Sequence, residues 1–224
     1  MPDTGLATAA DYSEALLTAR RAKSTICLLL ALFLVGQIAV FLLLRYDVVK
    51  LPGTAADPLS LVVDHSTTTQ PDSVTKARLV DLLHYVTGVI ILAGIALSVV
   101  LAMTLCLIGH IMLVGRLIGV GRVTGAIVWT LVLIVFLLPW QTFLQTDFRV
   151  AGALWTWDEL IHRYNFVSSM SSDNWPSTVL SWFRFVGAPL VALILVLLIQ
   201  LRSNRGLRMA LGEDELLNEM LRQS

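Results

Sequence analysis

Four long runs of apolar residues dominate the pattern of the chain. They cover residues 24–44, 85–108, 123–140 and 185–201, and the helix of the second run is expected to continue to about 115. An α-helix rises about 1.5 Å per residue, so runs of this length match the roughly 30 Å hydrocarbon thickness of a bilayer. The pattern predicts an all-α, polytopic integral membrane protein in which four transmembrane helices form a bundle.

Basic residues beside these runs predict the orientation. The segments 1–23, 115–122 and 202–224 carry Arg20, Arg21, Lys23, Arg116, Arg122, Arg202, Arg205 and Arg208. Short cytoplasmic segments of membrane proteins are enriched in Lys and Arg. Both termini are therefore expected in the cytoplasm of a plasma or inner membrane, and the connections 45–84 and 141–184 outside. No cleavage-site pattern closes the first run, so it is predicted to be an uncleaved signal anchor.

The second outer connection is rich in tryptophan, a residue that favours the membrane interface. Within it an apolar stripe has helical spacing: Trp157, Leu160, Ile161 and Tyr164. Thr156 and Glu159 form a capping-box pattern, and Glu159 to Arg163 is an i, i+4 ion pair. The pattern predicts a short helix over about 157–167 that lies in the outer membrane interface. Arg184, at the start of the fourth run, is expected to extend its side chain to the headgroups.

Both ends of the chain carry helix signals. Asp11 and Glu14 resemble a capping box, which predicts one helix that continues into the first span. In 202–224, Gly212 precedes an acidic start and a stripe of apolar residues, formed by Leu216, Leu217, Met220 and Leu221. This pattern predicts a cytoplasmic amphipathic helix. Its stripe needs a partner surface, which is the protein's own cytoplasmic face, another subunit or the lipid headgroups.

Composition agrees with a membrane protein, since 56% of the residues are hydrophobic and 14% are charged. The 16 basic and 16 acidic residues balance, and no nucleic-acid-binding motif occurs, so a nucleic-acid partner is not expected. Cys27 and Cys106 lie inside apolar runs, where a thiol behaves as a small hydrophobe, so no disulfide is expected.

No Asp, Glu, Lys, Arg or His lies deep within the four runs. Ion-coupled transporters, proton pumps and channels usually keep ionisable groups at this depth, so these classes are disfavoured. The polar residues of the spans are expected to hydrogen-bond between helices; they are Gln37, Thr87, Ser98, Thr104 and Thr130. Glycines around the second turn are expected to permit close helix approach: Gly115, Gly119, Gly121 and Gly125.

Two pairs of acidic and histidine residues suggest a metal site on the outer side. Asp81 with His84, and Glu159 with His162, each place a carboxylate and an imidazole at i, i+3 on a predicted helix. Helical bundles hold iron or manganese with such pairs, and neighbouring carboxylates complete the site. Further ligands would come from Asp158, Asp64 or His65. The simpler alternative is that these residues form a solvated polar face.

Histidine is also the usual axial ligand of a b-type haem. His84 and His110 lie at opposite ends of the second span, about 39 Å apart on a straight helix, so they cannot share one haem. His84 with His162 is the remaining pair.

No catalytic motif occurs, and an enzyme is not favoured. The interpretation that remains is a non-enzymatic accessory or scaffold component of a membrane assembly. Its partners would be the lipid bilayer and other membrane subunits or a second copy of the chain. The alternatives are a metal- or haem-bearing redox protein and a small-molecule permeability protein.

Overall fold

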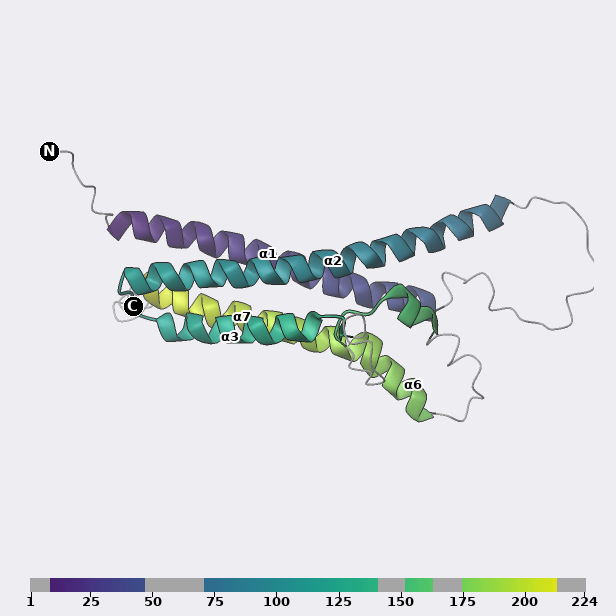
Figure 1. Cartoon of the computed structure of the whole chain (residues 1–224). Coiled ribbons are helices and arrows are strands. Elements are labelled where there is room, and N and C mark those ends of the chain that lie inside the picture. Colours follow the sequence, from purple (N-terminus) through teal and green to yellow (C-terminus); the bar gives the residue numbers. More distant parts are fainter. Residues whose placement is uncertain (1–8, 47–70, 141–151, 163–174, 213–224) are drawn as a thin grey trace, which may run out of the picture. The chain divides into compact units, whose positions relative to one another are not determined.

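The computed structural model describes residues 9–46, 71–140, 152–162 and 175–212, which contain helices and no strand (Figure 1). The predicted all-α class is confirmed. The helices are α1 (Ala9–Arg45), α2 (Pro71–Val114), α3 (Val120–Leu137), α6 (Trp175–Trp182), a π-helical turn η1 (Phe183–Gly187) and α7 (Ala188–Ala210). The C-terminal amphipathic helix predicted beyond Gly212 lies outside the described residues.

Four helices are long and apolar enough to cross a membrane. They comprise Ser13–Arg45, Asp81–Val114, Val120–Leu137 and Val179–Ala210. The four apolar runs of the sequence therefore do form four helices. α1 continues into the first run, as predicted, but it begins at Ala9, so Asp11 lies inside the helix and is not its N-cap.

The helix bounds differ from the limits of the apolar runs. α1 and α2 begin well before residues 24 and 85, because polar residues can extend a helix that is already nucleated by its apolar part. α3 ends at Leu137, earlier than the predicted residue 140. Leu138 has ψ 132°, the extended conformation that the following Pro139 imposes on its neighbour.

The chain forms two compact units, which we describe separately. Unit 1 consists of Met1–Phe33, Gly94–Leu138 and Leu190–Ser224, and unit 2 consists of Leu34–Ala93 and Pro139–Pro189.

Unit 1 is an antiparallel arrangement of four helical segments. α1 meets α7, where Lys23 Nζ donates to Ser203 Oγ at 2.6 Å. α7 meets α3 at Gly206, which lies against Gly119 and Val123, and α3 meets α2 where Val123 lies close to Gly109. α2 and α1 together line a groove on the surface. Neighbours in sequence are therefore neighbours in space, as in an up-and-down bundle.

This topology gathers the basic segments at one end of unit 1. The start of α1, the end of α2, the start of α3 and the end of α7 meet there, through contacts such as Lys23 with Ser203 and Arg202 with Gly125. The cationic residues at this end are Arg20, Arg21, Lys23, Arg116, Arg122, Arg202, Arg205 and Arg208. We call it the basic end.

Each helix of unit 1 buries one face and exposes another apolar face. The interior is formed by residues such as Leu16, Leu30, Leu101, Leu105, Ile108, Met112, Leu133 and Ile199. The exposed side chains include Leu28, Met103, Val128 and Leu197. Large apolar areas of this kind are unusual on a protein surrounded by water.

Glycines allow the turn between α2 and α3 to pack against α7. Gly119 has φ 101°, and a Cβ atom there would lie 2.7 Å from the carbonyl oxygen of Gly206. At Gly125 a Cβ would meet the Arg202 guanidinium at 2.7 Å. The prediction of close approach is confirmed at these two positions. A Cβ added at Gly121 would have nothing within 4 Å, so this glycine serves no packing contact.

The core of unit 2 is built around aromatic side chains. α1 contributes Val40, Phe41 and Leu44, α2 contributes Leu83, and η1 contributes Phe185. The rest of this core comes from the segment 152–162: Trp155, Trp157 and Leu160.

Candidate functional site: the buried tryptophan segment

Residues 152–162 fold into the core of unit 2, and we call them the tryptophan segment. Ala153, Leu154 and Trp155 are buried, and a short helical stretch follows over 157–162. Thr156 caps this stretch, because its Oγ1 accepts a hydrogen bond from the Glu159 backbone N–H at 3.3 Å. The helical segment that the capping pattern predicted is thus present up to the end of the described residues at His162.

Two residues of the apolar stripe, Trp157 and Leu160, are buried in the core of unit 2, and the place of the helix in the membrane interface stays a prediction. Both side chains pack against residues of α1 and α2 there. An apolar stripe gains similar free energy by leaving water in either place. The stripe is therefore visible in the sequence, but the surface that covers it is not. Tyr164 and Arg163 lie outside the described residues.

Stacked and edge-on rings fix Trp155 in this core. Its ring meets Phe185 edge-on at a centroid distance of 5.5 Å. Phe185 stacks on Phe41 at 5.1 Å, and Phe41 in turn meets Trp182 edge-on at 5.6 Å. Both arrangements are favourable for aromatic pairs, so α1, the tryptophan segment and η1 hold one another through their rings.

Gln37 ties the backbone of the tryptophan segment to α1. It is fully buried, and its Nε2 donates to the carbonyl oxygen of Trp155 at 3.2 Å. Gln37 Oε1 and Trp155 Nε1 are buried without a hydrogen-bond partner. Leaving such groups unpaired costs free energy, so this polar contact specifies a position more than it stabilises the fold.

Arg184 holds the same segment from the other side. Its guanidinium donates to both carboxylate oxygens of Glu159, at 2.8 Å and 3.0 Å, and also to the carbonyl oxygen of Gly152. The side chains of Arg184 and Glu159 are only 12% and 21% exposed. The expectation that Arg184 extends to the headgroups is therefore wrong, because a two-pronged ion pair with Glu159 takes up its charge.

A wide helical turn precedes α7 and carries Arg184. In η1 the backbone N–H of Ala188 donates to Phe183, five residues back, where an α-helix bonds four back. Pro189 follows, has no N–H for the carbonyl of Phe185, and disturbs the regular ladder at this point. Arg184 is the second residue of this wide turn.

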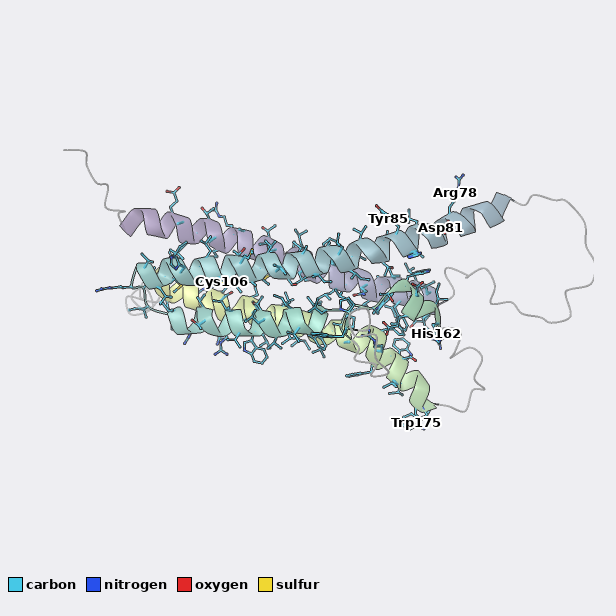
Figure 2. The ribbon with its side chains drawn as sticks, in the orientation of Figure 1. Arg78, Asp81, Tyr85, Cys106, His162 and Trp175 are labelled. Carbon is cyan, nitrogen blue, oxygen red and sulfur yellow. The ribbon has the colours of Figure 1, made fainter. Side chains whose placement is uncertain are left out.

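The four predicted metal ligands fall in unit 2. Figure 2 labels two of them, Asp81 and His162. Asp81 and His162 are exposed, and the Glu159 carboxylate is bonded to Arg184. The ring of His84 stacks on Trp157, with centroids 6.1 Å apart and an interplanar angle of 8°. Within the described ranges no three His, Cys, Asp or Glu side chains come together as a metal site would require.

The other histidine and acidic residues named in the metal and haem hypotheses do not join these four. His110 is exposed on α2 in unit 1. Asp64 and His65 lie outside the described residues. The metal and haem hypotheses stay predictions, and the described geometry adds nothing in their favour.

Most polar residues of the spans bond within their own helix. Thr87, Thr104 and Thr130 donate to the carbonyl oxygens four residues earlier, and Ser98 donates three residues back. The prediction that they join helices is wrong for these four. Gln37 does join distant segments, but its partner is the non-helical backbone at Trp155.

A second polar cluster in unit 1 also joins helices. Lys23 is fully buried and donates to Ser203 Oγ and Asn204 Oδ1, each at 2.6 Å. Gln200 Nε2 donates to Ser24 Oγ at 3.1 Å. Local spacing predicts neither this cluster nor the Arg184–Glu159 pair, because the partners are far apart in the chain. Cys27 is buried nearby, and both cysteines are free.

The contacts of the tryptophan segment and of Lys23 bind segments of the protein to one another, and none of them presents an activated nucleophile or an acid–base pair. Compared with known proteins, the chain matches no protein-family model, no curated protein and no solved structure. Its role has to be inferred from its own residues.

Proposed function

We propose that the chain is a non-enzymatic, four-span integral membrane protein that acts as an accessory or scaffold component of a membrane assembly. The observation that carries this proposal is the use made of the buried polar groups. Lys23, Arg184, Glu159 and Gln37 all join segments of the protein. A transporter or enzyme would turn such groups toward a solute or substrate.

Insertion in a membrane is supported by the exposed apolar faces of the four helices. Side chains such as Leu28, Met103 and Leu197 would be stable against lipid tails, whereas in water they would promote association. The aromatic core of unit 2 would then form a folded element on the outer side.

The orientation is supported by the basic end of unit 1. Eight Lys and Arg residues from segments distant in the sequence converge there, and such concentrations remain in the cytoplasm. We therefore place both termini in the cytoplasm and the connections 45–84 and 141–184 outside.

Cysteine labelling from each side of sealed cells tests this topology. Cys27 and Cys106 are first replaced by Ala, and single cysteines are introduced as S60C, N165C and I118C. Ile118 is a matched control, because it is 77% exposed in the turn at the basic end. An impermeant maleimide added outside should label S60C and N165C, and should label I118C only after permeabilisation. Labelling in the opposite order would overturn the orientation.

Native electrophoresis and mass analysis of protein extracted in mild detergent test the scaffold role. An accessory subunit should migrate as a larger species that contains another membrane chain, or a second copy of itself, in fixed ratio. Migration as a single chain, together with solute flux in reconstituted vesicles, would contradict the proposal and favour a permeability protein.

A further inference from the structure

A surface groove lies at the basic end of unit 1, between α1 and α2. Small side chains of α1 form one wall and apolar side chains of α2 the other: Glu14, Ala15, Thr18, Ala19, Ala22, Thr104, Leu107 and Ile111. Its volume is about 610 Å³, far more than the roughly 30 Å³ that one water occupies. The groove has room for several side chains of an occupant.

The groove extends from the level of the buried Lys23 in the direction of the chain ends. Leu107 borders it and is 56% exposed, and Leu113, Val114 and Ile118 nearby are also exposed. Headgroups and water would surround these apolar side chains if the basic residues mark the membrane boundary. An apolar surface at this level would gain stability from a cover.

The end of α7 lies level with the groove. α1 and α7 run antiparallel, with Lys23 opposite Ser203. Gly212 lies nine residues after Ser203, and Glu14 lies nine residues before Lys23. Nine residues extend about 14 Å along a helix. Gly212 is therefore level with Glu14, at the far end of the groove. Gly212 has φ 69°, and its N–H donates to the carbonyl of Met209, so the helix ends there in the left-handed conformation that reverses a chain.

The residues that follow Gly212 are complementary to this end of unit 1. They include four acidic side chains, Glu213, Asp214, Glu215 and Glu219, and an apolar stripe at helical spacing, Leu216, Leu217, Met220 and Leu221. The described residues of the basic end contribute seven arginines and, as their acidic side chain, Glu14. Three residues between Gly212 and the stripe span up to about 10 Å, the distance between neighbouring helices.

We propose that the segment 213–224 docks intramolecularly in the α1–α2 groove. Its stripe covers the apolar walls, and its carboxylates lie among the arginines of the basic end. The small side chains of Ala15, Ala19 and Ala22 let a helix approach closely there. The proposal goes beyond the scaffold role and needs no particular orientation in the membrane, so its failure would leave the proposed topology intact.

Disulfide trapping tests the docking in the full-length, detergent-solubilised protein lacking Cys27 and Cys106. Ala19→Cys is combined with Met220→Cys on the stripe or, as a matched control, with Asn218→Cys on the opposite face of the segment. Mild oxidation should close A19C to M220C within one chain at least several-fold faster than A19C to N218C. Equal rates, no closure, or a disulfide-linked dimer in place of the internal bond would overturn the proposal.

Labelling of Ala15→Cys distinguishes the segment from lipid headgroups as the occupant. In phosphatidylcholine nanodiscs, replacing the four stripe residues by Gln should increase the labelling rate by a hydrophilic maleimide several-fold. α7 ends at Ala210, before the replaced residues, so unit 1 should fold in both proteins. If protection instead requires phosphatidylglycerol and is insensitive to the stripe, anionic headgroups fill the groove and the proposal fails.

Discussion

Gly119 is the residue at which a single methyl group is expected to disturb unit 1. Its positive φ and the carbonyl of Gly206, 2.7 Å from where a Cβ would stand, both oppose a side chain. Gly119→Ala should lower the stability of the protein by about 1–3 kcal/mol. The measurement is the thermal unfolding midpoint in detergent.

Gly121→Ala is the matched control for that substitution. Gly121 lies in α3 with nothing within 4 Å of an added Cβ, and Ala is the better helix former. Its midpoint should equal or exceed that of the wild type. Equal losses for both variants would show that α3 does not pack against α7 through Gly119.

The ion pair between Arg184 and Glu159 is expected to stabilise the folded protein, and Gln at either position cannot reproduce its two-pronged geometry. Both side chains are mostly buried, so removing one leaves the other charge poorly solvated. Glu159→Gln and Arg184→Gln should each cost about 1–3 kcal/mol, and the double variant clearly less than their sum. Unfolding midpoints of the three variants give the coupling energy.

Asp158→Asn controls for the loss of a negative charge in the same stretch. Asp158 is exposed, so its change should stay within about 0.5 kcal/mol. A coupling energy near zero between positions 159 and 184 would mean that the two charges do not hold the tryptophan segment in solution.

Among elements, η1 is the wide helical turn that carries Arg184. Its i, i+5 bond accommodates one residue more than an α-turn. Deleting Val186 should convert the turn to a regular α-helix and rotate the residues before the deletion by about 100° relative to those directly after it. Arg184 would then leave Glu159, and the coupling energy between these two positions should vanish. A coupling that persists in the deletion variant would show that the wide turn does not direct Arg184.

The helices illustrate which elements a sequence can predict. An apolar run long enough to span a bilayer has few alternatives to a helix, so all four runs became helices. The capping signal at Thr156 is local and was equally predictable. Local effects set two of the described helix ends, the proline after Leu138 and the left-handed Gly212 after α7.

The candidate site was harder to predict, because its contacts join distant parts of the chain. Gln37 stands out as a polar residue within an apolar run, yet nothing near it in sequence identifies Trp155 as its partner. The i, i+4 rule assigned Glu159 to Arg163, whereas Arg184, 25 residues away, binds its carboxylate. Local spacing proposes partners within one helix and cannot rank them against a partner brought in by the fold.

At the scale of the whole molecule, the two units differ in where their charged and aromatic side chains lie. In unit 1 every described Lys and Arg lies at or beyond the level of Lys23, which suits a membrane boundary. In unit 2 aromatic rings and the ion pair of Arg184 with Glu159 hold the described segment 152–162 in the core. These contacts use the buried polar groups for packing, which is why we propose a scaffold role and not transport.

The metal content of the whole molecule distinguishes the scaffold role from the metal and haem alternatives. Iron or manganese needs several ligands free to converge, whereas both oxygens of Glu159 are engaged by Arg184 and His84 stacks on Trp157. Protein purified in mild detergent should therefore contain iron and manganese well below one atom per chain and show no haem absorption. Elemental analysis with an absorption spectrum provides the measurement.

Arg184→Gln is the informative variant, because it frees the Glu159 carboxylate. Metal that appears only in this variant would show that the ion pair excludes it. Stoichiometric metal in the wild type, lost in His84→Ala or His162→Ala, would replace the scaffold role with a redox one.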